Sequence, residues 1–177
     1  MTDIEYQYLT GKDAAVVLAE EYVSLYRENY AEPPYLSGPL YSRERFLERT
    51  GQQVTSDSFT LVSARSGAKL VGFSFGFAFA AGRWWGGEAT VPAPEVVAAP
   101  KFAVIELDVH QDYRRRGIGR QLLETLLAQQ PAPYATLLAD PDAPAHAMYQ
   151  RWGWQLVGPV RPAPDARASD AMVIALG

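Results

Sequence analysis

A short basic segment, residues 114–120, carries the strongest chemical signal in the sequence. It reads Arg-Arg-Arg-Gly-Ile-Gly-Arg and joins an apolar stretch to a helical pattern, with Gly117 and Gly119 where the helix would begin. Backbone amides at a helix start have no intrahelical partner and carry the positive end of the helix dipole. With arginines nearby, such amides favour an anion such as a phosphate or pyrophosphate.

Two common nucleotide-binding motifs do not fit this segment. A Walker loop requires Gly-Lys followed by Ser or Thr, whereas Gly119 is followed by Arg120 and Gln121. A dinucleotide fingerprint requires a third small residue where this chain has Leu122. Two simpler interpretations stay open: a glycine turn with solvated arginines, and an arginine contact to nucleic acid, which no other basic patch in the chain extends.

Two motifs, in the same order and spacing, resemble those of the GNAT superfamily of acetyl-coenzyme A-dependent acetyltransferases. The first is Ile-Glu-Leu-Asp-Val at 105–109 followed by Arg-x-x-Gly-x-Gly at 114–119, similar to the family's signature strand, pyrophosphate loop and helix. The second is Ala-x-x-Met-Tyr at 145–149 followed by Trp-Gly-Trp at 152–154, similar to its later helix and the strand that follows. The resemblance covers about residues 101–160.

The sequence departs from the family pattern at three positions, of which Trp154, in place of the commoner phenylalanine, is a conservative exchange in a packing role. The other two affect the cofactor region. Gln111 stands where proline is common, and Asp142 stands where an asparagine often contacts the cofactor. The departure at Asp142 leaves that cofactor contact without a counterpart.

The resemblance implies direct transfer of an acetyl group from acetyl-CoA, the acetyl donor, to an amine, which agrees with the absence of cysteine. It implies that the strand offers backbone groups to the pantetheine arm where it separates from a parallel neighbour at 134–139, and that the loop amides hold the pyrophosphate. No metal is expected. The implied cofactor-binding residues are Leu107, Asp108, Val109, Arg114, Arg115, Arg116, Gly117, Ile118, Gly119 and Arg120.

The resemblance also implies two catalytic residues. Tyr149 matches the family's frequent general acid, a phenol that is protonated at neutral pH and would give a proton to the leaving thiolate. Glu106 is the candidate base, because strand alternation points it to the face opposite Leu107, and it could act through water. Asp108 shares that face, so the base could also be Asp108 or a water chain. Tyr149 could instead only pack, and either carboxylate could be merely solvated.

The acceptor amine is less defined by the sequence. The acidic excess of the chain lies within residues 1–100, where tyrosines also gather, and both features favour a cationic amine. Tyr35, Trp84 and Trp85 are the candidate substrate-binding residues, since the later motifs would be occupied by the cofactor. A small molecule is favoured over a protein lysine or N-terminus, and a non-catalytic acyl-CoA-binding regulatory module is the alternative class.

The elements that must position these residues follow from the hydrophobic pattern. We expect strands over 4–9, 59–64, 70–81, 101–109, 134–139, 154–160 and 171–176, and helices over 15–29, from Ser42 to Gly51, from Gly117, and over 143–152. Residues 82–100 are expected to form a long loop. The pattern predicts a mixed α/β fold of the α+β type, with a mostly antiparallel, twisted sheet flanked by helices and one splayed parallel pair at the cofactor site.

Composition sets the remaining limits. The 177 residues predict one domain spanning 1–177, and 48% hydrophobic residues predict a packed core. A net charge of −4 argues against a general nucleic-acid binder, and two histidines are too few for most metal centres. With no secretory signal or membrane span in the pattern, we expect a cytoplasmic protein without a membrane partner, either a monomer or a homodimer.

Overall fold

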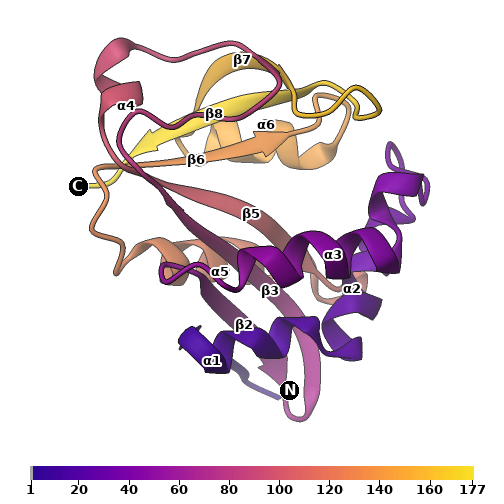
Figure 1. The fold of residues 1–177 in the computed structure, drawn as a ribbon. Helices are drawn as coiled ribbons and strands as arrows, with labels where there is room; N and C mark the ends of the chain where they lie inside the picture. Colours follow the sequence, from indigo (N-terminus) through magenta and orange to yellow (C-terminus); the bar gives the residue numbers. More distant parts are fainter. Residues whose placement is uncertain (1) are drawn as a thin grey trace. The chain divides into compact units, whose positions relative to one another are not determined.

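The computed structural model describes residues 2–177, whose strands form an eight-stranded sheet in the order β1-β2-β3-β5-β6-β8-β7-β4 (Figure 1). The strands are β1 (Ile4–Thr10), β2 (Thr60–Ser66), β3 (Lys69–Phe79), β4 (Glu88–Ala89), β5 (Lys101–Val109), β6 (Tyr134–Ala139), β7 (Gln155–Arg161) and β8 (Ser169–Ala175). The pairs β1–β2, β2–β3, β4–β7, β6–β8 and β7–β8 are antiparallel, and β5–β6 is parallel. The predicted mixed, mostly antiparallel fold is therefore confirmed.

Helices flank this sheet. They are α1 (Gly11–Ala14), α2 (Glu20–Tyr30), α3 (Arg43–Gln53), α4 (Pro94–Ala98), α5 (Ile118–Leu127) and α6 (Pro144–Arg151). Short 3₁₀ turns, η1 (Ala15–Leu18), η2 (Pro39–Tyr41) and η3 (Gln111–Tyr113), join several of them. The crossover from β5 to β6 runs through α5, as a parallel pair requires.

The chain forms two compact units. Unit 1 comprises the chain up to Phe77 together with Ile105–Gln129, and unit 2 comprises Ala78–Val104 and Gln130–Gly177. Strands β3 and β5 pass from one unit into the other, because each contains a unit boundary.

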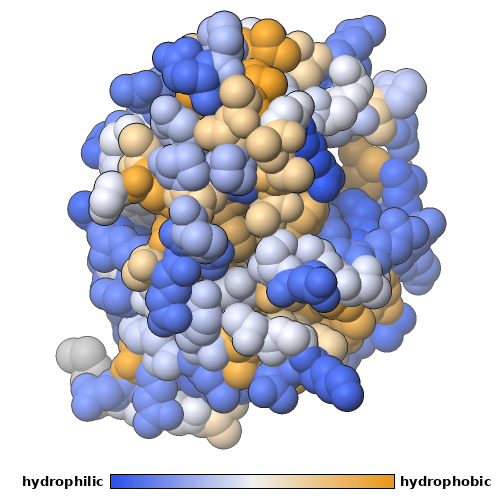
Figure 2. All heavy atoms as spheres, turned by 60° about the vertical axis from the view of Figure 1, so that its left-hand side comes forward, coloured by the Kyte–Doolittle hydropathy of each residue, from blue (hydrophilic) through white to orange (hydrophobic). Residues whose placement is uncertain are grey.

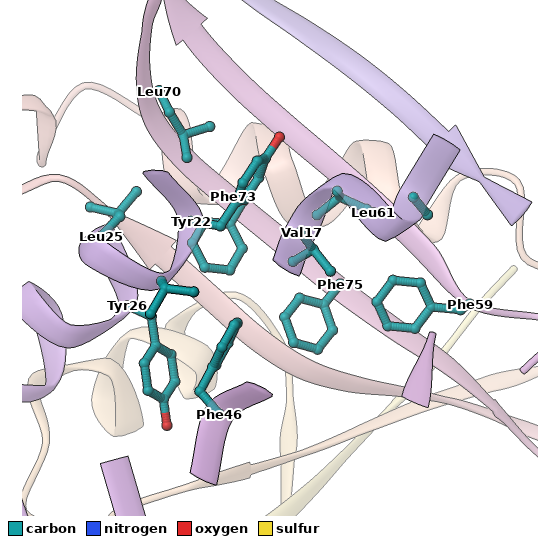
Figure 3. Packing of buried hydrophobic residues seen from close by; sticks show 12 residues of the cluster. Val17, Tyr22, Leu25, Tyr26, Phe46, Phe59, Leu61, Leu70, Phe73 and Phe75 are labelled. Carbon is teal, nitrogen blue, oxygen red and sulfur yellow. The ribbon is translucent and has the colours of Figure 1, made fainter. Parts of the chain in front are cut away.

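Aromatic residues of α2, α3 and β3 form much of the core of unit 1 (Figure 3). Tyr22 on α2 meets the Phe73 ring edge-on at a centroid distance of 5.3 Å, and its hydroxyl pairs with Ser63 Oγ at 2.7 Å. The buried core members are Ala14, Val17, Tyr22, Val23, Leu25, Tyr26, Phe46, Phe59, Leu61, Leu70, Phe73 and Phe75. The alternation of phenylalanines along β3 thus supplies the apolar face that α2 and α3 cover.

The opposite face of the same strands is covered by α5. A side chain added at Gly72, which neighbours Phe73 and so points to the other face, would lie 3.0 Å from Leu122 Cδ1 of α5 and 3.0 Å from the Asp108 carbonyl oxygen. Gly72 therefore permits the close approach of β3, β5 and α5. The Val71 carbonyl accepts the His110 amide at 2.8 Å, and Ser74 Oγ donates to the Glu106 carbonyl at 2.7 Å.

In unit 2 the parallel register of β5 and β6 ends early. Lys101–Ala103 pair with Tyr134–Thr136, although β5 continues to Val109 and β6 to Ala139. The shortness of this register agrees with the predicted splay of the parallel pair. The buried Lys101 ammonium group donates to the carbonyls of Val96, Val97 and Ala99 at 2.6 to 3.0 Å, which ties the end of α4 to the start of β5.

Three expectations about secondary structure were wrong in detail. The helix expected over 15–29 is interrupted at Ala19, whose backbone is extended (φ −69°, ψ 152°) and whose carbonyl accepts the first amides of α2. Gly51 does not end α3, because Val54 still bonds the Thr50 carbonyl at 2.9 Å. The loop at 82–100 contains β4 and α4.

Large hydrophobic residues at the surface are few among residues 2–177. Val16, Leu36, Val91 and Leu156 are the exposed ones. Figure 2 shows one face of the molecule, on which hydrophobic residues form separate groups among hydrophilic ones. No helix within residues 2–177 is long and apolar enough to cross a bilayer.

Candidate active site

The end of α2 meets the two acidic residues of β5 inside unit 1. Strand alternation places Glu106 and Asp108 on one face of β5, as predicted. The Tyr30 hydroxyl donates to Glu106 Oε2 at 2.9 Å, and Asn29 Nδ2 donates to Asp108 Oδ1 at 3.0 Å. Two adjacent residues of one helix therefore hold two carboxyl groups that lie more than seventy positions later in the chain.

The two carboxyl groups are not equivalent. Glu106 is half-buried, whereas the Asp108 residue is only 3% exposed. Burial, and then the negative charge of Asp108, raises the pKa of Glu106 well above its ordinary value. Burial raises the pKa of Asp108 to about 7, although the hydrogen bond from Asn29 opposes the increase. The pair consequently holds a proton at a pH at which isolated carboxyl groups have lost theirs.

One oxygen of the pair lacks a donor. Asp108 Oδ2 is buried and accepts no hydrogen bond from any N–H or O–H donor within residues 2–177. A buried carboxylate oxygen in this state carries a desolvation cost. It is available to a proton on the neighbouring carboxyl group.

Tyrosines gather beside Glu106. The rings of Tyr30, Tyr35 and Tyr41 contact one another pairwise at centroid distances of 4.5 to 5.3 Å, and Tyr26 lies 4.5 Å from Tyr30. Arg49 on α3 donates to the Tyr26 hydroxyl at 2.8 Å. Burial and the nearby carboxylates raise the pKa of Tyr30, so its phenol stays protonated as the donor to Glu106.

The basic segment forms the start of α5, also in unit 1. Arg115 and Gly117 adopt left-handed backbone conformations (φ 61° and 78°), and no side chain caps the helix that begins at Ile118. A side chain built on Gly117 would meet no atom within 4 Å. This segment therefore has the open, uncapped amides that a pyrophosphate requires, and its residues fit that group.

The side chains of Arg114, Arg116 and Arg120 in this segment have partners within the protein. Arg114 donates to Glu32, Asn29 and the Val109 carbonyl. Arg116 donates to the Asp112 carbonyl at 3.1 Å, and Arg120 pairs with Glu124 at 2.9 Å. The backbone amides at the start of α5, rather than these guanidinium groups, are thus the donors without a side-chain acceptor among residues 2–177.

The predicted general acid, Tyr149, and the two predicted substrate-binding tryptophans belong to unit 2. Tyr149 on α6 is buried, and its ring meets Trp152 and Trp154 edge-on at 6.0 and 6.1 Å. The indole of Trp84 donates to the Thr90 carbonyl at 2.9 Å, and that of Trp85 donates to Thr136 Oγ1 at 3.0 Å. Glu106, Asp108, the basic segment 114–120 and Tyr35 therefore all lie in unit 1, whereas Tyr149 and the two tryptophans lie in unit 2.

Comparison with protein families decides what this arrangement belongs to. The model of the acetyltransferase (GNAT) family matches residues 19–154. The chain belongs to the GNAT acetyltransferase family. A search of curated proteins gave no match.

Solved structures of other proteins share the fold. The PaiA N-acetyltransferase of Thermoplasma acidophilum, in complex with coenzyme A, is 15% identical, with a TM-score of 0.61 and coverage of 98% of this chain and 99% of that chain. PH1933 of Pyrococcus horikoshii is 21% identical, with a TM-score of 0.66 and 99% coverage of both chains. Arabidopsis thaliana NAA60, in complex with acetyl-CoA, is 17% identical, with a TM-score of 0.64 and coverage of 98% and 99%.

Within this GNAT chain, residues 2–177 contain no cluster of His, Asp and Glu side chains that could hold a metal ion. The sequence did not single out Asn29, Glu32 or Arg49 as site residues. Tyr30 was one of the tyrosines that suggested a cationic acceptor, but nothing in the local sequence links it to Glu106. Only the fold brings these residues together.

Proposed function

We propose that this GNAT chain is an N-acetyltransferase that moves an acetyl group from acetyl-CoA to a primary amine, with Glu106 as the proton acceptor. The observation that carries the proposal is a half-buried Glu106 held by Tyr30 in the same unit as the uncapped start of α5. The structural neighbours in complex with coenzyme A or acetyl-CoA support the choice of donor.

Acetyl-CoA as substrate would supply the activated acyl carbonyl and a thiolate leaving group. The amides of 115–120 would bind its pyrophosphate, and the backbone of Leu107–Val109 would bind its pantetheine arm. The uncapped helix start and the open space at Gly117 support the first assignment.

In its ionised form, Glu106 would take a proton from the incoming ammonium group, directly or through water, so that the neutral amine can attack. Because burial raises its pKa, this ionised form gains population as the pH rises. The hydrogen bond from Tyr30 fixes one carboxylate oxygen and leaves the other to face the amine. Tyr149 would then give its phenolic proton to the departing thiolate. Its protonated state at neutral pH and its motif position support that role.

The acceptor is proposed to be a small cationic amine. The tyrosine cluster at Tyr30, Tyr35 and Tyr41 and the negative charge of the carboxyl pair both favour a cation. Trp84 and Trp85 would act by shaping the segment that contains β4 and α4, since both indole N–H groups are used within unit 2. On this basis Tyr35→Ala should change acceptor selectivity more than Trp84→Ala.

The test is turnover with a panel of acceptors. Purified protein is incubated with acetyl-CoA and spermidine, an aminoglycoside, a lysine-containing peptide or a peptide with a free N-terminus, and thiol release and product mass are measured. We expect acetylation of a small polycation and a loss of about 10²–10⁴-fold in kcat/KM for Glu106→Gln. Tight acetyl-CoA binding without turnover on any acceptor would contradict the proposal and favour a non-catalytic acyl-CoA-binding module.

A further inference from the structure

Polar contacts connect the Asp108 side chain to the segment that precedes α5. Asn29 donates to Asp108 Oδ1 through its amide nitrogen, and its amide oxygen accepts from Arg114 Nη2 at 3.0 Å. The Arg114 guanidinium also donates to both Glu32 carboxylate oxygens, at 2.8 and 2.6 Å, and to the Val109 carbonyl at 3.1 Å. Because a guanidinium group only donates, Arg114 fixes the orientation of the Asn29 amide and turns its NH₂ group toward Asp108.

Burial separates the roles of the two carboxyl groups. At 3% exposure, the Asp108 side chain is too buried to contact the acceptor amine, whereas Glu106 is half-buried. Asp108 Oδ1 is occupied by Asn29, and Oδ2 is buried without a donor among residues 2–177. Oδ2 is therefore the Asp108 oxygen that remains for the side-chain hydrogen bond with Glu106, which lowers the pKa of Asp108.

We propose that Asp108 is a positioning residue for Glu106: the two carboxyl groups share one proton, and Arg114, acting through Asn29, holds Asp108 in place to accept it. This inference rests on the proposed function, in which Glu106 takes the proton from the amine. The reactive form is the pair that has lost its own proton to solvent. In that form an ammonium N–H bond breaks, a Glu106 O–H bond forms, and that proton is then shared with Asp108 Oδ2 until it returns to solvent. No electrons are exchanged with another reactant.

The charges around the pair are consistent with a shared proton. The groups that face it are the Tyr26 and Tyr30 phenols of α2, Arg49 of α3, and Arg114 with its partner Glu32. Burial raises the pKa of both carboxyl groups, and the charge of Asp108 raises the pKa of Glu106 further. The interaction with Glu106 lowers the pKa of Asp108, which is the result expected when one carboxyl group keeps a proton that the other accepts.

Two substitutions test the proposal in opposite directions. Asp108→Asn removes a negative charge beside Glu106, so the pKa of Glu106 should fall. Asn29→Ala removes a donor to Asp108, so the pKa of Asp108 should rise. Carbon-13 NMR titration of the labelled carboxyl groups measures both in the protein without substrate. Arg114→Lys, which cannot make the same set of contacts, should move the Asp108 pKa in the same direction as Asn29→Ala.

The pH dependence of kcat/KM, measured with the best acceptor from the panel, is a second test of the proposal. In Asn29→Ala, the acid limb of kcat/KM should move to higher pH, and a displacement of one pH unit lowers the rate on that limb about tenfold. The Kd for acetyl-CoA should stay unchanged. Tyr22→Phe is the matched control, because it removes a buried hydrogen bond of unit 1 to Ser63 and should leave the pH profile in place.

The outcomes separate the two proposals. Loss of rate in Asn29→Ala with an unmoved acid limb, or an unchanged Glu106 pKa in Asp108→Asn, would overturn the positioning role and leave Glu106 to act alone. Absence of turnover by the wild-type protein would overturn the proposed function, while the NMR titration would still decide whether the carboxyl pair shares a proton. Should Asp108→Asn fail to fold, the half-buried Asn29 and the exposed Arg114 provide the test.

Discussion

At the scale of single residues, Tyr149 has both a packing role and a proposed chemical one. Its ring is buried and lies edge-on to Trp152 and Trp154, which shows that the aromatic ring contributes to unit 2. The proposed general acid needs only the hydroxyl. Replacing the hydroxyl while keeping the ring therefore separates the two roles.

Tyr149→Phe should slow the chemical step by about 10²–10⁴-fold, the usual contribution of a positioned proton donor. The Kd for acetyl-CoA should change little, because backbone amides are proposed to hold the cofactor. Single-turnover kinetics with the confirmed acceptor measure this step even where product release limits the steady state. A chemical step within about twofold of wild type, far below the usual general-acid contribution, would restrict Tyr149 to packing.

The sequence allowed one part of the carboxyl site to be predicted. Strand alternation is a local property, so it correctly placed Glu106 and Asp108 on one face of β5. Their contacts with Asn29 and Tyr30 join residues 79 and 76 positions apart. No local rule yields such pairs, because they depend on how α2 packs over β5 in the folded unit.

At the scale of elements, the start of α5 combines a left-handed Gly117 with a helix that no side chain caps. The Arg-rich segment therefore presents amides rather than a capping carboxylate or hydroxyl. An added acidic side chain in the first turn of a helix stabilises the helix through its dipole. The same side chain would occupy the position proposed for the pyrophosphate, and its negative charge would repel that group.

Gly119→Glu should accordingly weaken acetyl-CoA binding by at least about tenfold, equivalent to about 1.4 kcal/mol, without unfolding unit 1. Calorimetric titration with coenzyme A measures the effect. Gln129→Glu, the same charge change just beyond the other end of α5, is the matched control and should bind normally. Equal affinity in a folded Gly119→Glu protein would mean that the pyrophosphate lies elsewhere.

Element boundaries show where the sequence was insufficient. The strand at 101–109 and the strand at 134–139 were predicted with the bounds that the structure has, because both are mostly apolar stretches that begin directly after a proline. The helix over 15–29 was predicted as continuous, since its apolar spacing persists through Ala19. Val17 and Tyr22 both pack into the core of unit 1. The break in the helix at Ala19 therefore depends on tertiary packing, which local apolar spacing does not reveal.

At the scale of the whole molecule, the buried carboxyl pair should make stability depend on pH. Burial raises the pKa of Asp108 from 3.8 to about 7, so the folded state binds more protons than the unfolded state between these values. Stability should therefore fall as pH rises from about 4 to about 7. A tenfold change in proton affinity corresponds to about 1.4 kcal/mol, so the titration of Asp108 lowers the free energy of unfolding by at most about 4 kcal/mol.

Urea unfolding at a series of pH values measures this slope, with Asp108→Asn as the comparison. The variant lacks the titrating group, so its free energy of unfolding should change less between pH 5 and pH 8, and it should exceed that of wild type at pH 8. Parallel pH profiles for the two proteins would contradict the buried, proton-holding state of Asp108.

The two compact units raise the question of whether the molecule unfolds in one step, as the predicted single domain requires. Strands β3 and β5 contain the unit boundaries, so unfolding either unit would leave part of each strand without its partners. We therefore expect one cooperative transition.

The distribution of chromophores makes this prediction testable without labels. All four tryptophans, Trp84, Trp85, Trp152 and Trp154, lie in unit 2, whereas the longest helices, α2, α3 and α5, lie in unit 1. Tryptophan fluorescence and far-UV circular dichroism should give the same urea midpoint. A fluorescence transition that is separated from the dichroism transition would mean that the units unfold independently, and the single-domain prediction would then be wrong.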